Sequence, residues 1–138
     1  MQKVIPSVKA IITENNKFLI LKYIEKDLII WDLPGGRINF AENPYNALTR
    51  EVKEEINLEI KIIKPIGMWW FIYKFTGQQI ICFTFLCTPK NNKVDLSKNP
   101  AKEKHIEYKW ITKDKFINKK EYHADRESLI DLIKNLKL

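Results

Sequence analysis

The chain has 138 residues, of which 45% are hydrophobic and 30% are charged. This balance is ordinary for a globular protein and excludes a disordered chain or a collagen-like repeat. The length fits one domain over residues 1–138. All apolar stretches are far shorter than the ~18 residues that a membrane span needs, and the N-terminal residues lack the pattern of an export signal. We therefore expect a cytoplasmic protein with no membrane partner.

The net charge is +7, from 24 Lys and Arg against 17 Asp and Glu. Such a chain attracts anions, including nucleotides, nucleic acids and acidic membranes. Because 21 of the basic residues are Lys and only 3 are Arg, most of this charge reads as solvated surface. No motif that mixes basic and aromatic residues is present, so nucleic acid is disfavoured as a partner.

The first third of the chain predicts strands joined by tight turns. Two β-rich runs, residues 4–13 and 17–23, flank Asn15 and form a hairpin. A third run, 28–31, stops at the Pro-Gly-Gly sequence of residues 34–36.

A helix follows between Asn43 and Asn57. Asn43 is a good N-cap, and Pro44 suits the first helical position because its missing N–H costs nothing there. Asn57 is a residue that tolerates the left-handed geometry of a helix end. The expected apolar stripe of this helix consists of Tyr45, Leu48, Val52 and Ile56.

The second half of the chain predicts more strands and a terminal helix. Runs 58–63, 66–75, 79–88 and 107–111 read as strands, with Gly77 in a hairpin turn and a polar loop over 91–104. Thr112 caps a short helical turn, and Asp125 caps an amphipathic helix over 126–138. This order predicts an α+β fold, an α/β/α sandwich with a mixed or antiparallel sheet. Cys82 and Cys87 are five apart on one strand, so they face opposite sides and stay unpaired.

One edge of the central helix carries three carboxylates. Glu51, Glu54 and Glu55 stand at i, i+3 and i+4, where like charges repel. A hard divalent cation is their natural partner, because Mg²⁺ and Mn²⁺ prefer carboxylate oxygens. Arg50, one turn before Glu54, is placed to hold that carboxylate. The alternative is a merely solvated acidic face.

The segment before the helix favours the cation. The Pro-Gly-Gly turn lets backbone approach a metal or phosphate closely, and Arg37 in the next loop supplies a fork suited to phosphate.

The segment 36–58 resembles the box of the Nudix hydrolases. That pattern is Gly-x5-Glu-x7-Arg-Glu-U-x-Glu-Glu-x-Gly-U, where U is a bulky aliphatic residue. Gly36, Glu42 and the run from Arg50 to Leu58 match every defined position except Asn57, where the family has Gly. The resemblance implies a Nudix-type α/β/α sandwich with a mixed sheet between helices.

The resemblance also implies metal-dependent hydrolysis, with Mg²⁺ or Mn²⁺, of the pyrophosphate linkage in a nucleoside diphosphate joined to another moiety. A nucleoside triphosphate or a nucleotide sugar is the expected substrate, and a homodimer is a common assembly of the family. The implied metal ligands are Glu51, Glu54, Glu55 and the Gly35 carbonyl. Glu54 or Glu103 would act as the general base, Arg50 would orient the glutamates, and Gly36 and Glu42 would be structural.

Substrate recognition is less defined by the sequence. Trp69 and Tyr73 share one face of the 66–75 strand, and Trp70 lies on the other. One face of the strand is expected to pack in the core, and an aromatic residue on the other face is placed to stack a nucleobase. The alternative is that both tryptophans pack in the core. Arg37 is expected to meet phosphate. The alternative hypothesis for the function of the chain is a non-catalytic protein of Nudix fold that senses or binds a nucleotide.

Overall fold

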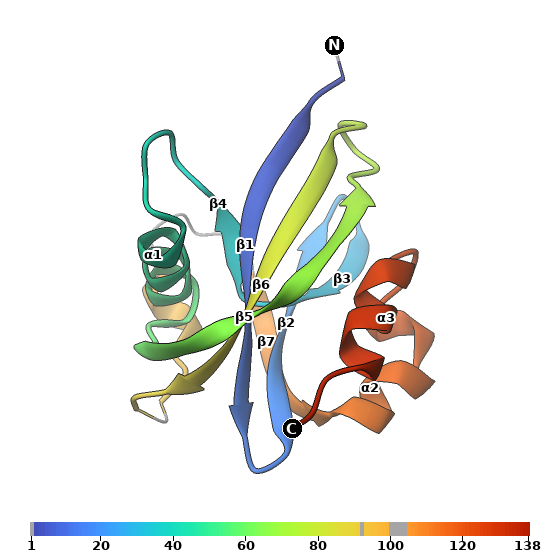
Figure 1. Cartoon of the computed structure of the whole chain (residues 1–138). Helices are drawn as coiled ribbons and strands as arrows, with labels where there is room; N and C mark the ends of the chain where they lie inside the picture. The colour runs from blue at the N-terminus through green and yellow to red at the C-terminus, as the bar shows by residue number, and fades with distance from the viewer. Residues whose placement is uncertain (1, 92, 100–104) are drawn as a thin grey trace.

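A mixed β-sheet lies between two helical layers in the computed structural model, which describes residues 2–91, 93–99 and 105–138 (Figure 1). Helix α1 (Pro44–Ile56) covers one face of the sheet, and α2 (Lys113–Asn118) and α3 (Glu127–Lys134) cover the other (Figure 1). This arrangement confirms the predicted α+β fold and α/β/α sandwich. Within the described ranges, no helix has the length and apolar character required to cross a membrane.

The described residues form seven strands in one sheet. The main path runs β3-β2-β1-β6-β5, with β4 paired to β1 and β7 paired to β2. Strands β1 and β6 are parallel, and the other pairs are antiparallel. The strands are β1 (Val4–Glu14), β2 (Lys17–Glu25), β3 (Leu28–Asp32), β4 (Gly35–Arg37), β5 (Ile60–Ile72), β6 (Gln79–Pro89) and β7 (His105–Thr112).

Each face of the sheet has its own apolar core, as the period of a strand requires. Ile12 of β1 packs on the α1 side, whereas its neighbour Ile11 packs on the α2–α3 side. Cys82 and Cys87 of β6 are likewise buried in different cores and are unpaired thiols, as predicted.

Strand β5 differs from expectation, because the two strands predicted over 58–63 and 66–75 are continuous. Pairing with β6 shifts register between Ile62 and Lys64 and again between Pro65 and Gly67. Gly67 has φ +143°. Irregularities of this kind let a strand accommodate Pro and Gly without ending.

The chain before α3 also differs from expectation. A 3₁₀ turn (Lys120–Tyr122) precedes α3, which starts at Glu127. Asp125 has φ +51° and is not the N-cap, so that prediction is wrong. The cap position is taken by Arg126, which makes no capping bond because a guanidinium has no acceptor atom; its side chain pairs with Asp32 instead.

Candidate active site

Helix α1 begins and ends where the sequence predicts. The Asn43 side chain accepts hydrogen bonds from the N–H groups of Tyr45 (2.8 Å) and Asn46 (3.4 Å). Asn57 has φ +54° and donates its N–H to the Lys53 carbonyl at 3.0 Å, so it closes the helix in left-handed geometry. These caps fix where α1 begins and ends, and burial of Leu48, Val52 and Ile56 in the core turns the glutamate edge away from the sheet's apolar face.

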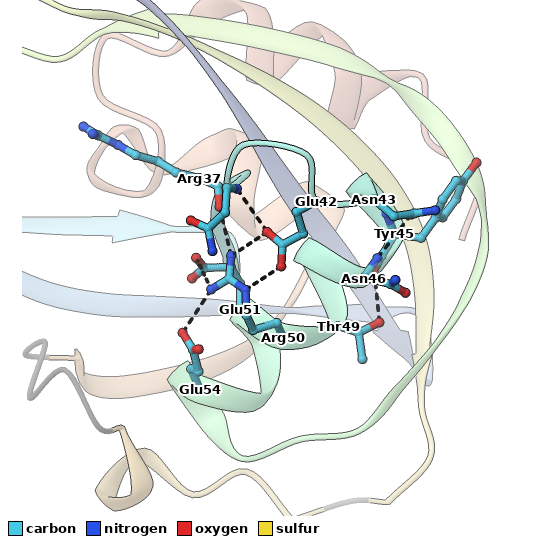
Figure 2. Close-up of polar contacts among 10 residues, drawn as sticks. Arg37, Glu42, Asn43, Tyr45, Asn46, Thr49, Arg50, Glu51 and Glu54 are labelled. Carbon is cyan, nitrogen blue, oxygen red and sulfur yellow. Dashed lines mark hydrogen bonds and ion pairs between the residues drawn. The ribbon is translucent and has the colours of Figure 1, made fainter.

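Arg50 lies at the centre of the acidic group (Figure 2). Its guanidinium grips Glu42 through two bonds, Nε to Oε2 at 2.8 Å and Nη2 to Oε1 at 3.0 Å. Nη1 also donates to Glu51 at 3.0 Å and to Glu54 at 3.3 Å. The hydrogen bonds from Arg50 and from the Asn39 N–H lower the pKa of Glu42 to about 2. One arginine therefore ties the loop before α1 to two of the three helical glutamates.

Glu55 points the other way, toward the Pro-Gly-Gly turn. Its Oε1 accepts a hydrogen bond from the Gly35 N–H at 2.7 Å. The group of Gly35 that contacts this carboxylate is therefore its amide, whereas the resemblance implied a role for its carbonyl. Burial raises the pKa of Glu55 to about 8, although Lys9 and the Gly35 amide favour its charged form. Burial likewise raises the pKa of Glu51. A Cβ at Gly36 would lie 2.6 Å from the Glu51 carboxyl carbon, so only glycine leaves room for that carboxylate.

The donor chemistry of this edge fits a hard divalent cation. Glu51 and Glu55 are partly buried carboxylates whose charged forms are disfavoured by desolvation, and a bound cation would relieve that cost. Within the ranges that the structure describes, no three acidic, His or Cys side chains converge as a ready-made metal centre. Two of the three helical glutamates, Glu51 and Glu54, instead contact Arg50.

A cavity of about 270 Å³ opens beside Glu55, Gly35 and Gly36. Arg37 lines it, and its Nη2 donates to the Gln78 side chain at 3.1 Å. Tyr73 lines it as well, with its hydroxyl hydrogen-bonded to Glu25. Of the residues predicted to bind substrate, the structure brings these two, Arg37 and Tyr73, to the acidic edge.

The two tryptophans lie elsewhere. Trp69 is fully buried in the core on the α2–α3 side, which matches the alternative of a packing role. Trp70 is 45% exposed on the opposite face of β5 and lines a groove beside α3. Neither lines the cavity beside Glu55. Glu103, the second predicted base, is outside the described residues.

Three charged residues near the cavity were missed by sequence reasoning. Lys9 and Asp32 line it, and Arg126 pairs with Asp32 at 3.0 Å. The sequence does contain a sign of two of these residues, because Lys9 interrupts the apolar run of β1 and Asp32 directly follows the apolar run of β3. A single charge inside a buried strand is uncommon unless it is paired.

Comparisons with known proteins agree with this geometry. The chain is 31% identical over 115 residues to an 8-oxo-dGTP diphosphatase from Buchnera aphidicola subsp. Schizaphis graminum, covering 80% of this chain and 81% of that one. It is 28% identical over 79 residues to a MutT-like protein from Streptomyces ambofaciens. That match covers 57% of this chain and only 47% of the Streptomyces protein.

Structural similarity extends over nearly the whole chain. The MutT protein from Methanosarcina mazei Go1 superposes with a TM-score of 0.81 at 28% identity, covering 96% of this chain and 92% of that one. The family model described as NUDIX domain matches residues 3–133. The chain therefore belongs to the Nudix hydrolase family.

Proposed function

We propose that this Nudix enzyme hydrolyses the pyrophosphate linkage of a nucleoside diphosphate joined to another moiety, with Mg²⁺ or Mn²⁺ as cofactor. A nucleoside triphosphate is the first candidate substrate, in keeping with the name of the Buchnera relative, and a nucleotide sugar is the second. One observation carries the proposal: buried Glu55 and its neighbour Glu51 sit under two glycines at the edge of a cavity.

When bound, the divalent ion would neutralise charge on the phosphate oxygens and lower the pKa of a water molecule. Glu51, Glu54 and Glu55 are the residues that would hold it. Glu54 is the most exposed of the charges around Arg50, with 43% of its side chain accessible. That exposure suits a group that takes a proton from water, so Glu54 is the favoured base and Glu103 the second candidate.

Residues of the cavity would hold the rest of the substrate. Arg37 would bind a phosphate oxygen through its guanidinium, since arginine forks match phosphate geometry. Phe71 and Tyr73 offer aromatic surface on which a nucleobase would stack.

The alternative is a protein that binds nucleotide without turnover. The contacts from Arg50 to Glu51 and Glu54 favour it, because a guanidinium already neutralises that side of the helix. The cavity and Arg37 would serve a binding protein equally well.

Hydrolysis of a nucleotide panel with Mg²⁺ or Mn²⁺ tests the proposal. The panel comprises nucleoside triphosphates, nucleotide sugars, ADP-ribose and dinucleoside polyphosphates. We expect cleavage of the pyrophosphate linkage, which releases phosphate or pyrophosphate from a nucleoside triphosphate and a nucleotide plus a second phosphorylated product from the other substrates. EDTA should abolish this cleavage, and Glu55→Gln should lower it by about 10²-fold or more. Glu59→Gln is the matched control, because Glu59 is exposed and pairs only with Lys53, at 3.7 Å, in the described structure. Full turnover by Glu55→Gln contradicts the assigned roles, and tight binding with no turnover favours the alternative.

A further inference from the structure

The face of the sheet that carries α1 continues beyond the helix as an apolar surface. Phe85 of β6 packs in the core under α1, and Phe83, two residues earlier, lies on the same face of the strand. Met68 of β5 is the cross-strand partner of Phe83, and Trp70 and Ile72 follow it at the period of a strand. Figure 1 shows α1 beside the start of β5, whereas the second half of that strand runs on past the helix. Among the described residues, α1 is the only α-helix on this face, so this end of it is open to solvent.

The side chains at this end of the sheet are large and exposed. We call them the open sheet face: Val4, Tyr45, Met68, Trp70, Ile72 and Phe83, each between 42% and 61% exposed. Tyr45 joins the set from the first turn of α1, because its ring lies 5.2 Å from that of Phe85, centre to centre. Val4 joins it from β1, since Val4 and Ile72 both pair with Gln79 of β6. The surface thus extends across three strands and the start of a helix.

This surface carries no charged side chain, although 30% of the residues in the chain are charged. Its cross-strand rows are Ile72, Gln79 and Val4; Trp70, Ile81 and Pro6; and Met68, Phe83 and Val8. Gln79 is the one polar residue in these rows. Contiguous apolar surface of this kind marks an interaction site, and the centres of protein interfaces are depleted of charge and enriched in aromatic residues and Met. The composition of the open sheet face is therefore that of an interface.

The size of the open sheet face matches one side of a dimer. A large aromatic side chain has about 200 Å² of surface, so six large side chains that are half exposed offer on the order of 600 Å². Pro6, Ile38 and Ile81 border them and are exposed or half-buried as well. A specific interface of standard size buries about 800 Å² on each partner, roughly a tenth of the surface of a small protein. The chain has 8339 Å² of surface, so the open sheet face and its border supply an area of the required size.

The open sheet face also contains a hollow and a side chain that can enter it. Tyr45, Met68 and Phe83 line a hollow of about 560 Å³, together with buried Phe85. Trp70 does not line this hollow and stands two residues further along β5. A two-fold axis brings a surface opposite its own copy, so each Trp70 is then placed to enter the hollow of the partner. A partner of different sequence would need only one half of this match, and the presence of both halves on one face favours a second copy of the chain.

We propose that the open sheet face is the interface of a two-fold symmetric homodimer, with Trp70 of each copy seated in the hollow of the other. Two sheet faces packed in this way form a sandwich whose core is about 10 Å thick and is filled by the side chains of both sheets. The cavity beside Glu55 stays open, because Phe71 and Ile80, which line it, pack on the α2–α3 side. The inference goes beyond the proposed function and does not depend on it.

Sedimentation equilibrium of the full chain tests the interface. We expect a mass that rises with concentration toward twice the 16.4 kDa of the chain. The Kd should be micromolar or lower, as interfaces of this size allow. Met68→Glu should raise that Kd at least about a hundredfold, because it buries an unpaired carboxylate twice, once from each copy. Ile24→Glu is the matched control and should leave the Kd unchanged, since Ile24 of β2 is 45% exposed and lies outside the open sheet face.

A second variant serves if Met68→Glu does not fold. Tyr45→Glu places a carboxylate in the first turn of α1, where the helix dipole favours negative charge, so the helix keeps its stability. This variant should weaken the dimer as Met68→Glu does. Urea unfolding checks that each variant is folded.

The salt dependence distinguishes a second copy from an anionic lipid surface. Each copy carries a net charge of +7, so two copies repel and added salt should strengthen the dimer. Binding of a positively charged chain to anionic lipid weakens with salt instead. Co-sedimentation with phosphatidylserine vesicles measures that binding.

The outcomes decide between these occupants. A dimer that Met68→Glu and Tyr45→Glu dissociate and Ile24→Glu does not supports the proposal. A chain that stays monomeric at every concentration overturns it, and binding of that monomer to the vesicles, lost in Met68→Glu, assigns the face to a lipid surface. A dimer that Ile24→Glu weakens equally, or that neither of the other variants weakens, overturns the choice of face. These measurements use no nucleotide or metal, so their result is independent of the hydrolysis panel.

Discussion

Arg50 and the two glycines of the Pro-Gly-Gly turn determine how the glutamates of α1 are held. Arg50 contacts Glu42, Glu51 and Glu54, and the Gly35 amide contacts Glu55. The acidic edge is therefore divided into a side neutralised by a guanidinium and a buried side in which burial raises the pKa of the carboxyl group. This division gives each carboxylate a different environment, which a row of equivalent solvated glutamates would lack.

The contact between Gly36 and Glu51 gives a prediction for Gly36→Ala. The new Cβ would lie 2.6 Å from the Glu51 carboxyl carbon. The end of that side chain would swing away at little cost in stability, within about 1 kcal/mol. We expect activity to fall about tenfold to a hundredfold, because displacing Glu51, the proposed metal ligand, costs far more in rate than in folding. Nucleotide hydrolysis assays measure the activity, Mn²⁺ titration measures the metal affinity, and urea unfolding measures the stability of this variant.

Gly77→Ala serves as the control, because it is expected to change stability and leave the glutamates in place. No atom lies within 4 Å of a Cβ there, but φ is +73°. Stability should fall while Mn²⁺ affinity stays the same. Unchanged Mn²⁺ affinity in Gly36→Ala would contradict the role given to Glu51.

At the scale of elements, α1 presents its glutamates correctly because both of its ends are defined. The Asn43 cap starts the helix, and Asn57 ends it with φ +54°. Most of the family's box is matched in this chain by the usual residues, and Asn57 fits the glycine position before the final aliphatic residue by its conformation. The departure from glycine therefore leaves the geometry of the helix end intact.

The conformation of Asn57 predicts an order of stability. Asn57→Gly should keep or raise the free energy of unfolding, because glycine adopts this geometry without strain. Asn57→Ala should lower it by about 1 kcal/mol, since a Cβ disfavours left-handed backbone. Asn46→Ala makes the same chemical change at an exposed position inside α1, where alanine is the better helix former, and should not destabilise. Urea unfolding measures all three, and equal stability of Asn57→Ala and Asn57→Gly would contradict the argument.

At the scale of the molecule, one ionic group joins three parts of the chain. Asp32 at the end of β3 pairs with Lys9 of β1 and with Arg126 before α3. Burial alone would raise the pKa of Asp32, but the pairs with Lys9 and Arg126 outweigh it and lower that pKa. This group fastens the C-terminal helical layer to the sheet and, at the same time, faces the cavity beside Glu55.

These pairs predict a pH-dependent stability. Because the folded pKa of Asp32 is below its unfolded value of about 3.9, its contribution is complete above roughly pH 5 and is lost as pH falls through the folded pKa. Asp32→Asn should lower the free energy of unfolding by about 3 kcal/mol at pH 7, with a smaller difference at pH 3. Asp131→Asn, on the exposed side of α3, is the control. A difference that stays constant from pH 3 to pH 7 would contradict the assignment to charge.

The sequence by itself determined the parts of this protein whose cause is local. The caps and stripe of α1, the hairpin turns, the alternation that separates Cys82 from Cys87, and the spacing of Glu51, Glu54 and Glu55 follow from period and backbone preference. Only the tertiary structure decided the partners of those side chains. Arg126 reads as an ordinary helix-start residue, yet it lies against Asp32, 94 positions earlier. Trp69 of β5 enters the core, while Tyr73, just past the end of that strand, lines the cavity. Such pairings depend on how distant strands are ordered in the sheet, and a local pattern carries no information about that order.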